Sequence, residues 1–214
     1  MSAEEILTRL KDAIVEGDPG KSSLVVNEAI AQALDLKDIL NEAVIKAAEE
    51  VGTLYEKEEY FLADLLMTGD ALKAVMDVLK PKLSQQSEIK PQGSILIGTV
   101  QGDIHDIGKS LVVSLLNGQG FSVIDLGSDV PPEIFVEKAK EIKPDVIGLS
   151  GLLTSSISKM HETIILLKKA GIPSKIIIGG GTVSKASCVM IGADDCSKEG
   201  HEGIKKIKNM IQNI

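Results

Sequence analysis

One loop of the sequence combines residue types that could bind a metal or move a proton. Asp103, His105 and Gly108 form the pattern DxHxxG. A carboxylate two residues before an imidazole can accept the Nδ1 proton, which leaves Nε2 as a more basic metal ligand or proton acceptor. The motif by itself is also compatible with a capped, structural histidine. The other two histidines, His161 and His201, fall on predicted helices, where we expect surface groups.

Two further motifs follow the histidine loop at defined distances. Residues 109–149 separate the loop from Ser150, which begins an SxL motif, and residues 153–178 separate that motif from Gly179 and Gly180. A loose turn is the alternative explanation for the glycines. The histidine loop, the SxL motif and the glycine pair at these spacings indicate one kind of site far more specifically than the histidine loop does by itself.

The elements that must position these residues are strands and helices in alternation. Short β-branched, apolar runs separated by amphipathic segments indicate a parallel sheet covered on both faces. We therefore predict a doubly wound, flavodoxin-like or Rossmann-like α/β domain, whose ligands lie at the carboxyl ends of the strands. The predicted strands are 94–100, 121–126, 146–150 and 175–179, and the predicted helices are 107–117, 132–141, 156–170, a shorter one from 183, and 200–214.

The first part of the chain has a different pattern. Apolar residues in 2–83 recur at helical spacing, which predicts four or five helices in a small bundle. We expect Asp38 to cap one of these helices and Pro81 to end the last one. Residues 84–93 are polar and contain a proline, as expected for a linker between domains 1–83 and 94–214.

Composition excludes several classes of protein. The 214 residues carry 23 Lys and Arg against 31 Asp and Glu, and the net charge of −8 opposes binding to nucleic acid and to anionic membranes. Only 2% of the residues are aromatic, so stacking on single-stranded nucleic acid is not expected.

The sequence also indicates a compartment. The first residues carry acids rather than a basic stretch followed by an apolar core, and no apolar run reaches the roughly 18 residues of a membrane span. We expect a cytoplasmic protein. Cys188 and Cys196 belong to no CxxC or Cys/His cluster, and we expect two small, semi-buried thiols.

Taken together, DxHxxG, SxL and GG at these separations resemble the cobalamin-binding fold of methionine synthase, cobalamin-dependent mutases and the corrinoid proteins of methanogenic and acetogenic methyl transfer. The resemblance covers the chain from about Ser94 to its end. The segment EKEEYFLADLLMTGDALKAVMDVLKP is also similar to the helical cap domain of the methyltransferase branch. Nearly the whole chain therefore resembles this family.

The resemblance implies a role for each motif. His105 would replace the benzimidazole base of the cofactor as lower axial ligand of cobalt, Asp103 would accept its Nδ1 proton, and Ser156 would complete the relay. Asp103 and Ser156 would also handle the proton that accompanies ligand release. The nucleotide tail of the cofactor would be buried among small or hydroxyl-bearing residues. The implied cofactor-binding positions are Asp103, His105, Asp106, Ile107, Gly108, Ser150, Leu152, Thr154, Ser156, Gly179, Gly180 and Gly181.

The helical part would contribute to the other face of the cofactor. Phe61, with Leu65 one turn on, would shield the upper face of the corrin. The alternative is that the aromatic pair Tyr60 and Phe61 belongs to the core of the bundle.

The function implied by the resemblance is that of a corrinoid methyl carrier, which is not catalytic alone. The chain has no room for a substrate-activating barrel of about 250 residues, so a substrate-specific methyltransferase would process the donor. A methylated or quaternary amine is the favoured donor and methanol the second choice. A second methyltransferase would pass the methyl group to coenzyme M or tetrahydrofolate, and a reductive activation protein would be a further partner.

Two alternatives stay open. A small subunit of a cobalamin-dependent mutase would have the same α/β domain, but the helical part argues against it. A cobalamin-responsive regulator would need a DNA-binding element, for which the sequence offers neither a basic region nor spare length.

Overall fold

The computed structural model describes residues 2–83 and 91–213, except for the side chains of residues 80 and 83. It divides into two compact units, Met1–Gln92 with Ser114–Phe121, and Gly93–Val113 with Ser122–Ile214. The domain boundaries expected from the sequence stay a prediction. Residues 84–90 of the expected linker lie outside the described residues.

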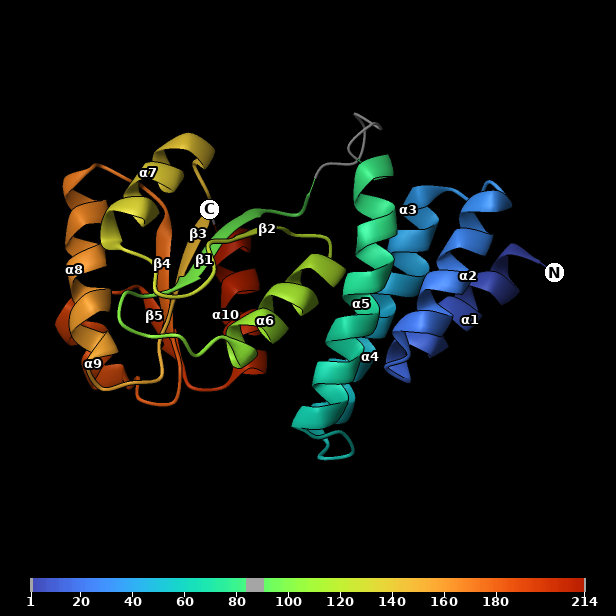
Figure 1. Ribbon diagram of the computed structural model, residues 1–214, viewed down its shortest axis with the longest axis horizontal. Helices are drawn as coiled ribbons and strands as arrows, with labels where there is room; N and C mark the ends of the chain where they lie inside the picture. Colours follow the sequence, from blue (N-terminus) through green and yellow to red (C-terminus); the bar gives the residue numbers. More distant parts are fainter. Residues whose placement is uncertain (1, 84–90, 214) are drawn as a thin grey trace. The chain divides into compact units, whose positions relative to one another are not determined.

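The first unit is helical, as predicted (Figure 1). Helix α2 packs against α1 and α5, and buried aliphatic side chains from all of the longer helices form its core. Ser2 and Glu5 form a capping box at the start of α1, and Asp18 caps α2. The elements of this unit are α1 (Ala3–Val15), α2 (Pro19–Ala31), α3 (Leu36–Asp38), the π-helix η1 (Ile39–Ile45), α4 (Lys46–Glu56) and α5 (Leu62–Leu83).

Two expectations about the ends of these helices are wrong. The capping residue is Asp35, which has extended backbone angles and accepts a hydrogen bond from Lys37 N at 2.8 Å, whereas Asp38 is already helical. Pro81 lies inside α5, which continues to Leu83. A proline this close to the end of a helix removes only one intrahelical hydrogen bond, and packing of the buried residues before it maintains the helix.

The second unit contains a five-stranded parallel sheet in the order β2-β1-β3-β4-β5. The register pairs Thr99 with Ser150 and Ser150 with Gly179, so the carboxyl ends of three strands meet at one edge. The strand order reverses between β1 and β3, and this switch point is where ligands bind in doubly wound folds. The strands are β1 (Ser94–Thr99), β2 (Ser122–Asp125), β3 (Val146–Ser150), β4 (Lys175–Gly179) and β5 (Asp195–Ser197).

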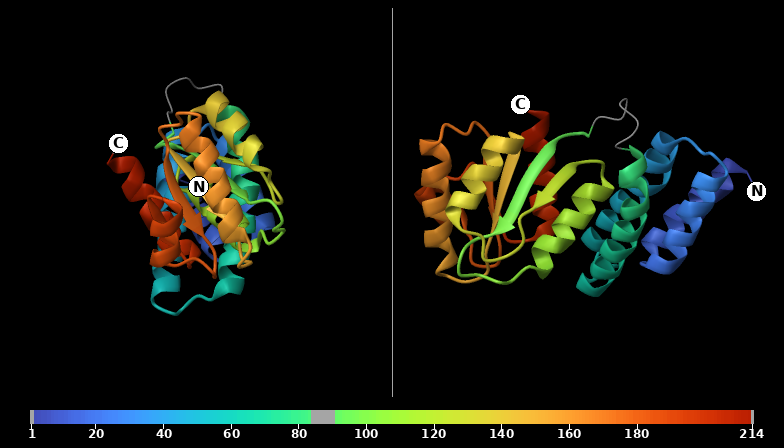
Figure 2. Two further views of the ribbon diagram at one scale, coloured as in Figure 1. Left: turned by 90° about the vertical axis from the view of Figure 1, so that its left-hand side faces the viewer. Right: turned by 45° about the horizontal axis from the view of Figure 1, so that its top comes forward.

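Helices cover both faces of this sheet (Figures 1 and 2). One face packs against α7, α8 and α9 through a core that includes Leu96, Ile147 and Phe135. The other face lies against α10 and the beginning of α6. The doubly wound α/β class is therefore confirmed. The helices are α6 (Ile107–Gly118), of which the residues from Ser114 on belong to the first unit, α7 (Pro132–Ile142), α8 (Ser156–Lys169), α9 (Lys185–Ile191) and α10 (Gly200–Gln212).

The sequence pattern missed one strand. β5 spans only Asp195–Ser197, which is too short for a periodicity to be recognised. It carries Cys196 at the sheet edge, and both cysteines are buried free thiols. Among the described residues, no helix combines the length and apolar character that crossing a membrane requires.

Candidate functional site

The loop that follows β1 is held by several hydrogen bonds. Gly102 has a φ of +83°, which favours glycine, and its N–H donates to Asp129 Oδ1 at 2.7 Å. The N–H of Asp129 donates in return to the carbonyl of Asp103 at 2.9 Å. The hydroxyl of Thr99 donates to the carbonyl of His105 at 3.2 Å. The backbone on both sides of the histidine is thereby fixed.

Asp103 holds the imidazole of His105 through its Nδ1 atom. Its Nδ1 lies 2.7 Å from Asp103 Oδ1, and its backbone N–H donates to the same oxygen at 3.0 Å. A carboxylate acceptor favours the tautomer with the proton on Nδ1, which leaves the lone pair on Nε2. Half of the side chain is exposed, so Nε2 is accessible to a ligand.

Asp103 is the centre of the arrangement. Its carboxyl group is fully buried, and its second oxygen accepts hydrogen bonds from Leu152 N at 2.6 Å, Leu153 N at 3.1 Å and Ser156 Oγ at 2.7 Å. Asp103 and His105 from the loop after β1 are thus brought together with Ser156, the first residue of α8.

These hydrogen bonds determine the charge of the carboxyl group. Burial alone raises the pKa of Asp103, but hydrogen bonds from Ser156, from the backbone of His105 and Leu152 and from the imidazole outweigh burial, so the pKa lies well below its ordinary value. Asp103 is therefore a permanently ionised acceptor at neutral pH. Ser156 helps to hold this carboxylate in place, and the expectation that Asp103 and Ser156 handle the proton of the ligand exchange stays a prediction.

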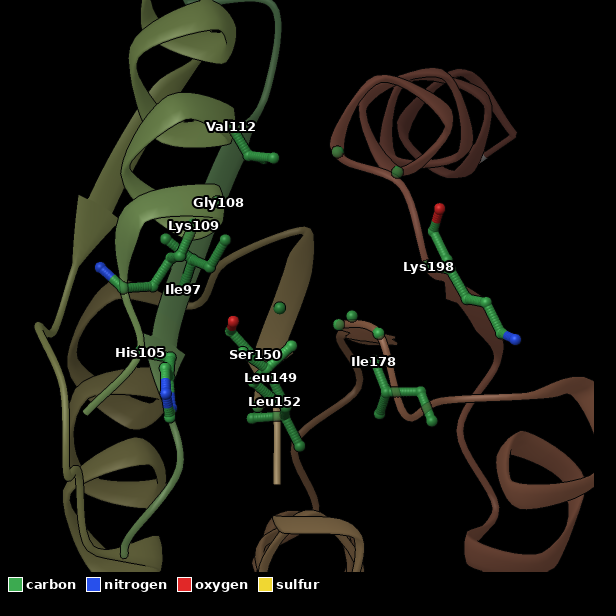
Figure 3. A pocket seen from close by; sticks show the side chains of 18 of the residues that line it. Ile97, His105, Gly108, Lys109, Val112, Leu149, Ser150, Leu152, Ile178 and Lys198 are labelled. Carbon is green, nitrogen blue, oxygen red and sulfur yellow. The ribbon is translucent and has the colours of Figure 1, made fainter. Parts of the chain in front are cut away.

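A cavity of about 490 Å³ lies within the second unit and opens beside His105 (Figure 3). It follows the face of the sheet between α6 and α10, where Val112 and Ile207 form apolar walls. The predicted residues that border it are His105, Asp106, Ile107, Gly108, Ser150, Leu152, Gly179, Gly180 and Gly181.

The glycines at this cavity serve different purposes. A methyl group at Gly108 would enter open space, and one at Gly179 would meet only Ser197 O at 3.8 Å, so both positions leave room in the cavity. Gly148 also borders the cavity but is not among the predicted residues, although an isolated glycine inside an apolar strand indicates a close approach of backbone or ligand. Gly180 is different, because the backbone of Gly151 occupies the place that a side chain at position 180 would need.

Four predicted cofactor-binding residues are not part of the cavity lining: Asp103 and Ser156, which hydrogen bond to each other, and Thr154 and Phe61. Thr154 is exposed in the turn before α8 and does not border the cavity, whereas Ser150 does, so the cofactor-binding role of Thr154 stays a prediction. Phe61 belongs to the helical unit and is 66% exposed, whereas Leu65 is buried. The expectation that Phe61, with Leu65 one turn on, shields the upper face of the corrin stays a prediction.

Other residues near the imidazole carry no signal that a motif search detects. Ile104, which is 76% exposed, borders the cavity together with Ile107 and Leu152, and Leu153, which is 40% exposed, follows Leu152 in the sequence; these four exposed apolar residues are called the apolar rim. Four exposed apolar side chains in two adjoining loops are typical of a surface that receives a ligand.

A buried ion pair fixes the start of α6. The ammonium group of Lys109 lies 2.6 Å from Asp125 Oδ1 at the end of β2, and the Lys109 side chain is only 1% exposed. Figure 3 shows this side chain leading away from the cavity, so its stem, rather than its charge, borders the space.

Comparison with known proteins identifies the class of this chain. Residues 93–208 match the family described as B12 binding domain, and residues 6–80 match a second family with the same description. The chain therefore belongs to the B12-binding proteins, in agreement with its parallel sheet, its histidine loop and the adjoining cavity.

The similarity to individual proteins extends over the full length. The chain is 37% identical over 213 residues to trimethylamine corrinoid protein 1 of Methanosarcina acetivorans, covering 98% of this chain and 99% of that protein. It is 38% identical over 213 residues to dimethylamine corrinoid protein 1 of the same organism, covering 99% and 100%.

Solved structures are likewise similar to this chain over nearly its full length. A chain of the methanol:cobalamin methyltransferase complex MtaBC from Methanosarcina barkeri matches with a TM-score of 0.86 and 26% identity, covering 98% of this chain and 81% of that chain. A cobalamin-binding protein from Desulfitobacterium hafniense DCB-2 matches with a TM-score of 0.72 and 34% identity, covering 98% of both chains.

Proposed function

We propose that the protein is a corrinoid methyl carrier that binds cobalamin with its benzimidazole base displaced and with His105 on the cobalt. The observation that supports this best is the combination of two features at one place. The imidazole is fixed through Nδ1 by an ionised carboxylate, and the cavity opens directly beside it. A base displaced from cobalt needs both a substitute ligand and a space to occupy.

The described residues fit such a cofactor. Nε2 is the lone-pair donor that a cobalt ion accepts, and Asp103 acts as the hydrogen-bonded acceptor that metal-bound imidazoles generally have. The rim of Ile104, Ile107, Leu152 and Leu153 offers an apolar seat for a macrocycle. The glycines at 108 and 179 leave the adjoining cavity open for a nucleotide tail.

When bound, the corrinoid supplies a cobalt ion that accepts a methyl group and gives it up again. The protein's own residues control the imidazole. Asp103 holds its Nδ1 proton and provides a negative charge that stabilises an imidazolium when Nε2 takes up a proton. Because five hydrogen bonds keep Asp103 ionised, that proton stays on His105.

The partners belong to the same proposal. We assign a substrate-specific methyltransferase as donor enzyme, a second methyltransferase as acceptor enzyme, a reductive activation protein as a further partner, and the cytoplasm as location. The similarity to proteins named trimethylamine and dimethylamine corrinoid proteins supports a methylated amine as donor. The likeness to a chain of a methanol:cobalamin methyltransferase complex supports methanol as the second choice.

The binding part of this proposal is tested with the full chain and hydroxocobalamin. We expect about one corrinoid per chain to remain bound through gel filtration. Gly179→Trp would fill the cavity and should release the corrinoid, whereas Ala186→Trp on α9, outside the cavity lining, should retain it. Equal retention by both variants would show that the cavity does not hold the cofactor.

A further inference from the structure

The backbone at the end of β4 lies against the backbone after β3, where Gly151 N–H donates to the carbonyl of Gly179 at 3.0 Å. Gly180 has a φ of +129°, a region that side-chain-bearing residues rarely adopt. A methyl carbon at this position would lie 1.9 Å from the carbonyl oxygen of Gly151, although such carbons essentially never come closer than 3.0 Å to another atom. Glycine is therefore required at position 180 by conformation and by space.

The touched carbonyl belongs to the peptide unit that binds Asp103. The carbonyl of Gly151 and the N–H of Leu152 lie in one rigid plane and point in opposite directions. Gly180 meets the carbonyl side of this plane, and the N–H side donates to Asp103 Oδ2 at 2.6 Å. Any displacement of the carbonyl thus moves the donor of the shortest hydrogen bond to Asp103.

Gly151 is restricted on its other side as well. A methyl carbon at this position would lie 2.5 Å from the Cβ of Ser156 and 3.0 Å from its hydroxyl oxygen. That hydroxyl donates to the same oxygen of Asp103 at 2.7 Å. A side chain at position 151 would therefore displace the second strong donor to Asp103.

We propose that Gly151 and Gly180 are positioning residues for the axial histidine, acting through Leu152 and Ser156 on Asp103 and through Asp103 on His105. In this arrangement Gly180, the second glycine of the GG motif, allows the Leu152 N–H to stay in place as a donor to Asp103, while its neighbour Gly179 leaves space in the cavity. The last link, from His105 to cobalt, rests on the proposed function. The links from Gly180 to Asp103 are properties of the chain without cofactor.

The first links are tested by amide NMR on the full-length protein without cofactor. In Gly180→Ala the Gly151 carbonyl has to move by about 1 Å, so the hydrogen bond from Leu152 to Asp103 lengthens and the amide proton resonances of Leu152 and Leu153 shift upfield. Gly179→Ala, which meets no atom closer than 3.8 Å, should leave both resonances in place. Unchanged resonances in Gly180→Ala would overturn the proposal.

A second control separates this effect from strain alone. Gly192 also has a positive φ, at +76°, and ends α9 in the same unit, where a methyl carbon would meet the flexible end of Lys168. Gly192→Ala should lower stability without moving the Leu152 resonance. If Gly180→Ala does not fold, Gly151→Ala tests the same relay, because it must displace Ser156 from Asp103. Retention of the Asp103 contacts in a folded Gly151→Ala would equally contradict the proposal.

The last link is tested on protein loaded with cobalamin. Electron paramagnetic resonance of the Co(II) form measures the fraction of molecules with a histidine nitrogen on cobalt. We expect the equilibrium constant for histidine ligation to fall at least about tenfold in Gly180→Ala relative to the wild type and to Gly192→Ala, whose position lies outside the cavity lining. If the amide resonances of Leu152 and Leu153 shift but histidine ligation is unchanged, the glycines do not act on His105, and the proposed function still holds. If the wild type itself shows no histidine nitrogen, the proposed function and this last link both fail, and the amide data still decide the role of the glycines.

Discussion

The hydroxyl of Ser156 donates a hydrogen bond to Asp103 at 2.7 Å, in the interior of the unit and across 53 positions of sequence. This bond joins the start of α8 to the loop that carries His105. The backbone N–H groups of Leu152 and Leu153, in the turn after β3, donate to the same oxygen, Oδ2 of Asp103. The position of the imidazole is therefore coupled to the turn after a neighbouring strand.

Replacing the carboxylate tests this coupling. Asp103→Asn removes the charge and presents an amide NH₂ group to one set of buried donors, so we expect the free energy of unfolding of the protein without cofactor to fall by about 1–3 kcal/mol. Corrinoid should still bind, but histidine ligation should weaken about 10- to 100-fold. Urea unfolding and the pH at which the histidine detaches measure the two effects. An Asn variant with unchanged stability and ligation would reduce Asp103 to a simple loop cap.

The lowered pKa of Asp103 predicts a pH dependence of stability. The ordinary pKa of 3.8 applies to the unfolded chain, and the folded pKa lies well below it. The unfolded state therefore takes up the proton first on acidification, so the stabilisation is complete well above pH 4 and is lost as the pH falls through and below that value. Urea midpoints from pH 6 to pH 3 should show the difference between wild type and Asp103→Asn shrinking toward low pH. A constant difference would contradict the lowered pKa.

Part of this site follows from the sequence and part does not. Continuous apolar strands predicted the parallel sheet, and parallel strands bring Thr99, Ser150 and Gly179 to one edge. The side-chain members of the relay were named from the resemblance of the DxHxxG and SxL motifs to the cobalamin-binding family, and the parallel sheet explains why they lie close together. The amides of Leu152 and Leu153 could not be named, because backbone donors have no residue type that marks them.

Asp129 is a second residue that the sequence did not reveal. It has a positive φ of +55°, and its carboxylate accepts the N–H of Gly102 from the histidine loop at 2.7 Å. We expect Asp129→Asn to preserve the loop, since asparagine tolerates this conformation and keeps an acceptor. Asp129→Ala should lower stability by about 1 kcal/mol and speed hydrogen exchange at Gly102. Equal exchange rates in both variants would show that Asp129 does not anchor the loop.

The ion pair of Lys109 and Asp125 leads to a further prediction. The ammonium group is buried while the Asp125 side chain is 28% exposed, so Lys109→Met should cost about 2–3 kcal/mol, less than breaking a fully buried pair. The double variant Lys109→Met/Asp125→Leu removes both charges and should recover most of that loss. Urea unfolding of the three proteins tests this. A double variant less stable than Lys109→Met would show that the pair itself is strongly stabilising.

Errors in the fold prediction have local causes. Asp35 rather than Asp38 caps its helix, and Pro81 is accommodated in the last turn of α5. The π-helix Ile39–Ile45 continues directly into α4, and its apolar spacing does not distinguish it from an α-helix. Each of these features depends on backbone hydrogen bonding that tertiary packing selects.

Isotope labelling of histidine tests the assignment of the axial ligand most directly. The full-length protein is prepared with ¹⁴N- or ¹⁵N-histidine, loaded with cobalamin, reduced to Co(II) and measured by electron paramagnetic resonance. We predict that each cobalt line splits into three with ¹⁴N and into two with ¹⁵N, that His105→Ala abolishes this dependence, and that His161→Ala, which alters an exposed residue of α8, preserves it. A spectrum whose nitrogen splitting is unaffected by the histidine label would place the benzimidazole on cobalt and contradict the assignment of His105.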